Sequence, residues 1–133
     1  MLLLDASVWV AAGVPAHQSH AAAVGLIRGE REVGTLDLAL YEVANTVGLR
    51  YRSPEQAGKL CALIRRRCAD EPARVDARLV EITLEEVAKH GLSAYDAAYV
   101  ALAEALDTTL LTGDRRLANA TGPRCRIELM RSP

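Results

Sequence analysis

The chain has 133 residues, half of them hydrophobic, which predicts a single domain over residues 1–133 that buries its own core. Its 16 basic and 17 acidic residues leave a formal net charge of -1, which excludes a general attraction to nucleic acid or to anionic membranes. The three cysteines form no C-x-x-C pair, and this favours reduced structural thiols over a disulfide framework or a zinc site.

The chain begins with a short apolar run, LLLD at residues 2–5, which is typical of a buried strand. A helix is expected from Ala6 to about Ala12, and within it Trp9 is interpreted as a residue packed on the sheet or at an interface. The apolar run has no basic flank, and Asp5 interrupts it far short of the ~20 residues that span a membrane. We therefore expect a cytoplasmic protein without membrane contact.

Helical and strand-like segments alternate along the rest of the chain. Helices are expected over residues 17–30, 38–51, 54–68, 79–90 and 94–106, with Ser53 as an N-cap and Pro54 at the first helical position. Strands are expected over residues 32–38, 74–77, 108–112 and 126–130. Strands separated by helices predict an α/β fold, with a parallel sheet of about four to five strands covered by helices on both faces.

Four carboxylates that are far apart in the sequence are expected at one edge of this sheet. Asp5 and Asp114 each follow a predicted strand directly. Glu42 lies about one turn into the helix after the second strand, and Asp96 lies in the first turn of another helix. Because ligands of open α/β sheets bind outside the carboxyl ends of the strands, this edge is the expected site.

Each acid also has a simpler explanation. Asp5 and Asp114 occupy positions where helix N-caps are expected, and Ser93 with Asp96 resembles a capping box with Asp in place of Glu. Glu42 lies too far inside its helix to cap it, so its simpler explanation is a solvent-facing glutamate. Their shared position at one sheet edge weighs against four unrelated explanations.

Carboxylates brought together repel one another unless cations or protons compensate their charge. Oxygen ligands suit Mg²⁺, and also Mn²⁺, because these hard ions use a few carboxylates and complete their shell with water and phosphate oxygens. Such ions activate an attacking water and stabilise the leaving oxygen of a phosphodiester. The pattern therefore predicts a metal-dependent nuclease site.

The ordered motifs LLLDASVWV, LALYEVANTVGLR, HGLSAYDAAYVALAEAL and LLTGDRRL resemble the PIN-domain ribonucleases, and specifically the VapC toxins of bacterial toxin–antitoxin pairs. The resemblance covers essentially the full chain. It implies a Mg²⁺-dependent endoribonuclease whose catalytic residues are Asp5, Glu42, Asp96 and Asp114, with Asp5, Asp96 and Asp114 as the metal ligands. It also implies a homodimer and a cognate VapB-type antitoxin whose C-terminal segment wraps near the acidic site.

The resemblance further implies a set of supporting polar residues. Ser7 and Thr112 match hydroxyl positions that orient a carboxylate or a metal-bound water, and Asn45 matches a polar position one turn after the catalytic glutamate. Arg115 and Arg116 are candidates for RNA contacts, because they adjoin the last acid and because guanidinium groups bind phosphate bidentately.

Other phosphate-handling folds fit the sequence less well. A phosphoacceptor receiver domain needs adjacent acids near the first strand and a lysine after a late strand, whereas LLLDAS has one acid and no lysine follows Lys89. A haloacid-dehalogenase-type phosphatase needs a second Asp at the position of Ser7. The alternative that stays open is a PIN-like RNA- or protein-binding module without significant nuclease activity.

Overall fold

The computed structural model describes residues 1–68 and 71–131. Within those ranges, four parallel strands form one sheet in the order β2-β1-β3-β4. The strands are β1 (Leu2–Leu4), β2 (Val33–Gly34), β3 (Thr109–Thr112) and β4 (Ile127–Leu129). Because all four strands run in one direction, their carboxyl ends lie at one edge, and the predicted α/β fold class with a parallel sheet is confirmed.

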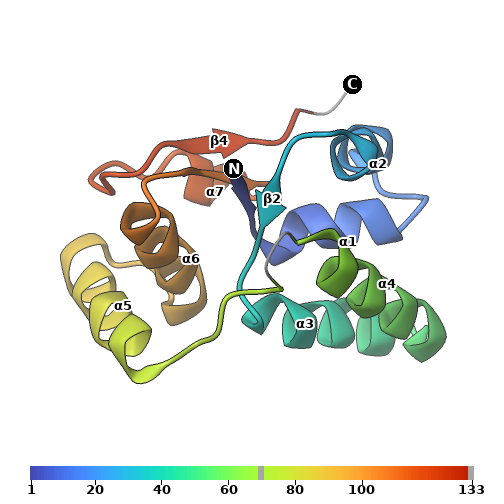
Figure 1. Cartoon of the computed structure of the whole chain (residues 1–133), viewed down its shortest axis with the longest axis horizontal. Coiled ribbons are helices and arrows are strands. Elements are labelled where there is room, and N and C mark those ends of the chain that lie inside the picture. The colour runs from blue at the N-terminus through green and yellow to red at the C-terminus, as the bar shows by residue number, and fades with distance from the viewer. Residues whose placement is uncertain (69–70, 132–133) are drawn as a thin grey trace.

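Helices cover both sides of this sheet, as predicted. They are α1 (Ala6–Gly13), α2 (His20–Arg28), α3 (Leu38–Val43), which continues into the π-helical η1 (Ala44–Arg50), α4 (Pro54–Arg67), α5 (Ala77–His90), α6 (Ala94–Ala105) and α7 (Arg115–Ala118). Figure 1 shows α5 and α6 on one side of β1 and β2, with α1 to α4 on the other side. The site edge therefore lies between two groups of helices.

The prediction of a strand at residues 74–77 is wrong. The chain forms a single bridge beside this segment, between Leu36 and Ala73. The Asp76 carboxylate accepts a hydrogen bond from the Leu79 backbone amide at 2.8 Å, so this residue caps α5 instead of extending a strand. Capping of the next helix thus ends the extended segment early.

One helix start and one helix cap also differ from the expectations. The helix predicted over residues 17–30 begins only at His20. Ser53 takes the N-cap position of α4, but its side chain makes no capping hydrogen bond, and Pro54 occupies the first helical position as predicted.

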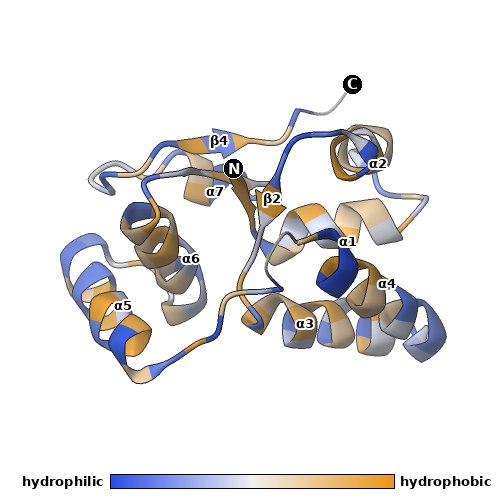
Figure 2. Cartoon of the chain, in the orientation of Figure 1, coloured by the Kyte–Doolittle hydropathy of each residue, from blue (hydrophilic) through white to orange (hydrophobic). Residues whose placement is uncertain are grey.

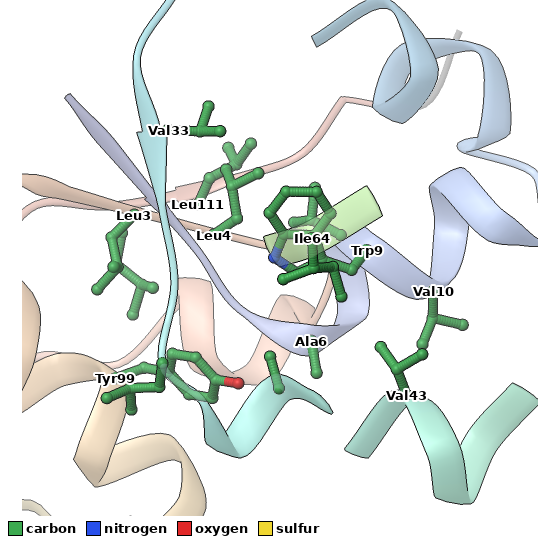
Figure 3. Packing of buried hydrophobic residues seen from close by; sticks show 14 of the residues in the cluster. Leu3, Leu4, Ala6, Trp9, Val10, Val33, Val43, Ile64, Tyr99 and Leu111 are labelled. Carbon is green, nitrogen blue, oxygen red and sulfur yellow. The ribbon is translucent and has the colours of Figure 1, made fainter. Parts of the chain in front are cut away.

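Trp9 of α1 lies in the centre of the hydrophobic core and is 0% exposed. Figure 3 shows it among the buried side chains of β1, α1 and α4, together with Leu4 and Ile64. Burial of an aromatic side chain removes about 150–250 Å² from water, which makes it a large contribution to stability. The interpretation of Trp9 as a packing residue is therefore confirmed.

In the described part of the chain, no helix is both long and apolar enough to cross a membrane. The longest helices, α4 and α5, have 14 residues each. Figure 2 shows hydrophilic stretches along both of them.

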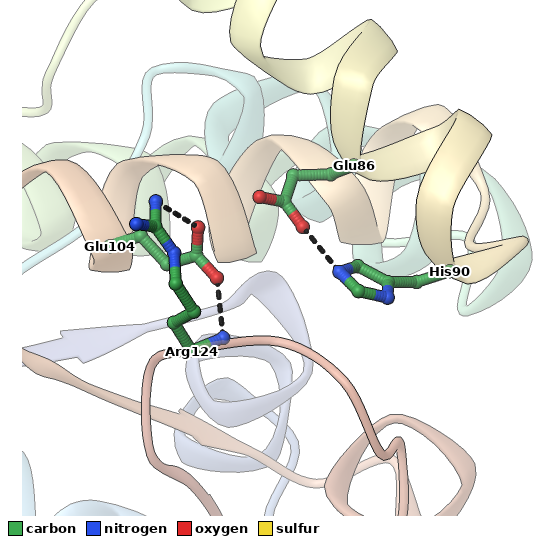
Figure 4. Close-up of polar contacts among 4 residues, drawn as sticks. All are labelled: Glu86, His90, Glu104 and Arg124. Atoms are coloured by element: carbon green, nitrogen blue, oxygen red, sulfur yellow. Dashed lines mark hydrogen bonds and ion pairs between the residues drawn. The ribbon is translucent and has the colours of Figure 1, made fainter.

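Two polar pairs lie on α5, α6 and the loop before β4 (Figure 4). The Glu104 carboxylate of α6 accepts a hydrogen bond from the Arg124 backbone amide at 2.6 Å, and a second from Arg124 Nη2 at 3.3 Å. On α5, Glu86 Oε2 lies 3.1 Å from His90 Nε2. Burial, and then the neighbouring Glu104, raises the pKa of Glu86. Glu104 thus holds the loop before β4 to α6, and both acids lie outside the predicted site.

Candidate active site

Asp5 lies where β1 ends and α1 begins, and it is only 5% exposed. The register of β1 and β3 pairs Leu4 with Leu111, so the next residues of the two strands, Asp5 and Thr112, are neighbours. Thr112 Oγ1 donates to Asp5 Oδ2 at 2.5 Å. Asp5 Oδ1 accepts from the Ser7 backbone amide at 3.0 Å and also from the Ser7 hydroxyl.

Two backbone amides fix the direction of these hydroxyl groups. Gly113 N donates to Ser7 Oγ at 2.7 Å, and Asp114 N donates to Thr112 Oγ1 at 3.0 Å. Because each hydroxyl has one proton and its oxygen already accepts an amide, that proton is directed at Asp5. The network therefore suits an ionised carboxylate at this position. That Ser7 and Thr112 also orient a metal-bound water stays a prediction.

Asp114 follows β3 and caps α7. Its Oδ1 accepts from Arg116 N at 2.8 Å and from Leu117 N at 3.4 Å. Both bonds use Oδ1, and no hydrogen bond reaches Oδ2 from the residues that the structure describes. The capping explanation of Asp114 is thus geometrically correct, and it leaves one carboxylate oxygen available.

The capping explanation is also geometrically correct for the two other expected caps. Asp5 caps α1 through Oδ1, and Ser93 caps α6 by accepting from the Asp96 backbone amide at 3.2 Å. That bond is one half of the predicted capping box, and it uses the main chain of Asp96. Capping and a place in the site are therefore compatible for these residues.

Glu42 is not the solvent-facing glutamate of the simpler explanation. Its Oε1 accepts a hydrogen bond from the Tyr99 hydroxyl at 2.8 Å, which joins α3 to α6. Tyr99 is 1% exposed and lies three residues after Asp96 on the same helix. The sequence did not single out Tyr99; its only signal was the helical spacing from a candidate acid.

Electrostatic coupling connects Glu42 with two of the other acids. Burial raises the pKa of Glu42; the hydrogen bond from Tyr99 opposes this effect, and the charges of Asp5 and Asp96 raise the pKa further. Burial also raises the pKa of Asp5, although its hydrogen bonds to Ser7 and other neighbours partly offset that effect.

Asp96 extends this coupling to the fourth acid. Burial raises the pKa of Asp96 and the charge of Asp114 raises it further, whereas Ser93 and Arg116 act in the opposite direction. These pairwise effects indicate that Asp5, Glu42, Asp96 and Asp114 lie in one region at the carboxyl edge of the sheet, which we call the acidic cluster.

No three His, Cys, Asp or Glu side chains within residues 1–68 and 71–131 stand close enough together to hold a metal ion as they are placed. The acidic cluster nevertheless offers only oxygen donors, including the uncommitted Oδ2 of Asp114. Such a donor set fits Mg²⁺, which binds through one or two carboxylates and keeps several waters.

The remaining predicted residues lie around this cluster. Arg116 lines a cavity of about 450 Å³ together with Ser93 and Asp96. Asn45 lines a groove that also contains Glu42. The Arg115 side chain is exposed, and its RNA contact stays a prediction.

Comparison with known proteins agrees with this architecture. A family model described as the PIN domain matches residues 2–123. Ribonuclease VapC3 of Pyrobaculum aerophilum is 36% identical over 121 residues, which cover 88% of this chain and 92% of that protein. Ribonuclease VapC1 of Mycobacterium tuberculosis is 56% identical over 54 residues, which are 41% of this chain, so the match spans about 39% of that relative's length.

Solved structures show the same fold at low sequence identity. The toxin VapC20 of Mycobacterium tuberculosis, described as cleaving the sarcin-ricin loop, has a TM-score of 0.76 and 22% identity, with 95% of this chain and 99% of that chain covered. VapBC2 of Rickettsia felis, bound to a DNA fragment from its promoter, has a TM-score of 0.71 and 18% identity, with 98% of both chains covered.

A parallel α/β domain with acidic residues at the carboxyl edge of its sheet is thus matched along nearly its whole length. The chain belongs to the PIN-domain family, and within that family to the VapC-type proteins.

Proposed function

We propose that this protein is a Mg²⁺-dependent endoribonuclease that acts as the toxin of a type II toxin–antitoxin system. The observation that supports it most strongly is the acidic cluster, in which carboxylates from separate parts of the chain lie near one another, so that the charges of Asp5 and Asp96 act on Glu42 and the charge of Asp114 acts on Asp96. A cation bound among neighbouring carboxylates offsets their mutual repulsion. The ribonuclease names of the VapC relatives support RNA as the substrate.

In this proposal Asp5, Asp96 and Asp114 hold Mg²⁺ or Mn²⁺. The bound ion supplies an activated water and charge neutralisation for hydrolysis of a phosphodiester. Ser7 and Thr112 keep the Asp5 carboxylate in one orientation. A supporting contact of this kind limits the freedom of a metal ligand and thereby strengthens metal binding.

Glu42 and Arg116 act on the substrate side of the cluster. The Tyr99 hydroxyl orients Glu42, and burial raises the pKa of this acid, so its carboxylate is suited to accept a proton from the attacking water. Arg116 lies beside Asp96, where its guanidinium reaches a phosphate oxygen of the RNA.

The activity is tested by incubating the purified chain with total RNA, in MgCl₂ and in EDTA. Cleavage that requires the metal is the expected result, and sequencing of the new 5′ ends identifies the bases at the cut. RNA that is bound but left intact in MgCl₂ would instead support the alternative, a PIN-like binding module without significant nuclease activity.

Thr112→Val is expected to slow RNA cleavage by about 10- to 100-fold, because it removes the hydroxyl that orients Asp5. It should also lower the free energy of unfolding by about 1–3 kcal/mol, since Asp5 Oδ2 and Asp114 N both lose a partner. Cleavage rates and urea unfolding measure the two effects. Thr108→Val is the matched control, because its hydroxyl donates to Met1 O beyond the other end of β3, away from the acidic cluster. Equal rates for both variants would contradict the orienting role.

The proposal includes a VapB-type antitoxin, a homodimer and a cytoplasmic location. Neighbouring structures support such a partner, since they contain VapBC2 and FitAB assemblies, the latter bound to an IR36 DNA fragment. A short reading frame immediately upstream is expected, and its co-expression should suppress the RNase activity. A monomer at micromolar concentration with no adjacent partner gene would contradict this part of the proposal.

A further inference from the structure

A groove of about 390 Å³ opens beside the acidic cluster. Its lining residues come from α3 and η1 and from the start of α6, and they include Tyr41, Glu42, Asn45, Arg50 and Tyr95. Glu42 belongs both to this groove and to the acidic cluster, so a ligand in the groove lies next to the reacting centre.

The two tyrosines of this groove are unusually exposed. Tyr41 is 81% exposed and Tyr95 is 61% exposed. Each directly precedes a candidate carboxylate, Glu42 or Asp96. Both rings line the groove together with Glu42, although Tyr41 belongs to α3 and Tyr95 to α6. A single exposed aromatic ring is ordinary, whereas two exposed rings that line one groove with polar residues are typical of an interaction site.

We propose that Tyr41 and Tyr95 are stacking platforms for unpaired bases of single-stranded RNA that flank the scissile phosphodiester. This inference rests on the proposed ribonuclease function and assigns two substrate-positioning residues to it. Aromatic rings stack on any base, because every base has a π-face. In double-stranded RNA the bases are already stacked on one another, so they cannot be received in this way.

The polar lining of the groove fits the rest of such a ligand. The Asn45 amide both donates and accepts, as recognition of a base edge requires. Arg50 is exposed and offers a guanidinium to a backbone phosphate. A more apolar hollow, better suited to a protein side chain, lies elsewhere along η1, around Leu49 and Pro54. The tyrosine groove therefore favours RNA as its occupant.

The test compares Tyr41→Ala and Tyr95→Ala with the wild type on a labelled single-stranded oligoribonucleotide in MgCl₂. Each alanine variant is expected to raise KM by about 5- to 150-fold, the loss that one base–aromatic stack represents. Tyr→Phe at either position should retain the wild-type KM, since the ring stays. Tyr51→Ala is the control: Tyr51 is 55% exposed but does not line the groove, so KM should not change.

Binding of the same oligonucleotide in EDTA, followed by fluorescence anisotropy, separates the two proposals. Weaker binding by both alanine variants supports the platforms even where the wild type cuts no RNA, and in that case the nuclease proposal alone fails. Unchanged KM and unchanged binding would overturn the platforms while the nuclease function stands. A change of oligomeric state in light scattering, with unchanged RNA binding, would overturn them in favour of a protein interface.

Discussion

Asp96→Asn is expected to remove nearly all RNA cleavage, by more than the roughly 10- to 100-fold that loss of a supporting residue costs a metal site. The amide keeps the shape of the side chain but loses the charge that binds the cation. Because Ser93 caps α6 through the Asp96 backbone amide, the substitution leaves the start of the helix intact. Initial cleavage rates in saturating MgCl₂ measure the effect.

Asp107→Asn is the matched control, since it removes the same charge just beyond the far end of α6. Asp107 has a φ of 48°, a left-handed conformation in which Asn is one of the favoured residues. Glu104 is less suitable because its carboxylate holds the Arg124 backbone. Loss of cleavage in Asp107→Asn equal to that in Asp96→Asn would remove the basis for placing Asp96 in the site.

Asp5→Asn should also abolish cleavage, but it should lower the stability of the fold as well. Both hydroxyl protons, from Ser7 and from Thr112, are directed at the Asp5 carboxylate. An amide nitrogen on either side would meet a donor where an acceptor is required. The stability of Asp5→Asn is therefore expected to lie below that of Asp96→Asn.

The arrangement of the strands could be predicted because apolar runs and helical patterns alternate along the chain. The order of the strands in the sheet follows from that alternation only in part. The residue-to-residue register between paired strands does not follow from it at all. The pairing of Leu4 with Leu111 brings Asp5 and Thr112 together across 107 positions of sequence. The sequence placed both residues at strand ends, and only packing could make them hydrogen-bonded neighbours.

Residues on helix surfaces were harder to interpret. Glu42 was as compatible with solvent as with the site, because nothing in its helix predicts that it faces the Tyr99 hydroxyl of a helix distant in sequence. Tyr41 and Tyr95 were missed for a related reason. The sequence pattern of a helix does not show whether a tyrosine ring on it is buried or exposed. Their positions next to candidate acids became informative only once the groove was seen.

In EDTA, Asp96→Asn and Asp114→Asn are expected to melt at higher temperature than the wild type. Burial and the charge of Asp114 raise the pKa of Asp96, so the folded protein disfavours the ionised form that is present at neutral pH. Asn at position 96 removes that charge. Asn at position 114 removes the charge that acts on Asp96, and it still accepts the capping bonds of α7.

The pH dependence of this gain has a definite sign. Because the folded pKa of Asp96 lies above its ordinary value of 3.8, the native state binds the proton more tightly than the unfolded state. The contribution of this group to stability therefore rises as the pH falls through the raised pKa. The advantage of Asp96→Asn should be largest near pH 8 and should shrink as the pH approaches the ordinary Asp value.

Adding MgCl₂ or MnCl₂ should reverse the order of the melting temperatures. An ion that binds only the native state stabilises the wild type by about 2.7 kcal/mol at a hundredfold excess over its dissociation constant. Asp96→Asn and Asp114→Asn each lack one ligand and should lose most of that gain. If these acids serve only as helix residues, Asn costs no more than a dipole interaction of about 0.3–1 kcal/mol, and metal has no effect. If the melting temperatures of both variants are unchanged or lowered in EDTA and do not respond to metal, Asp114 serves only as the N-cap of α7.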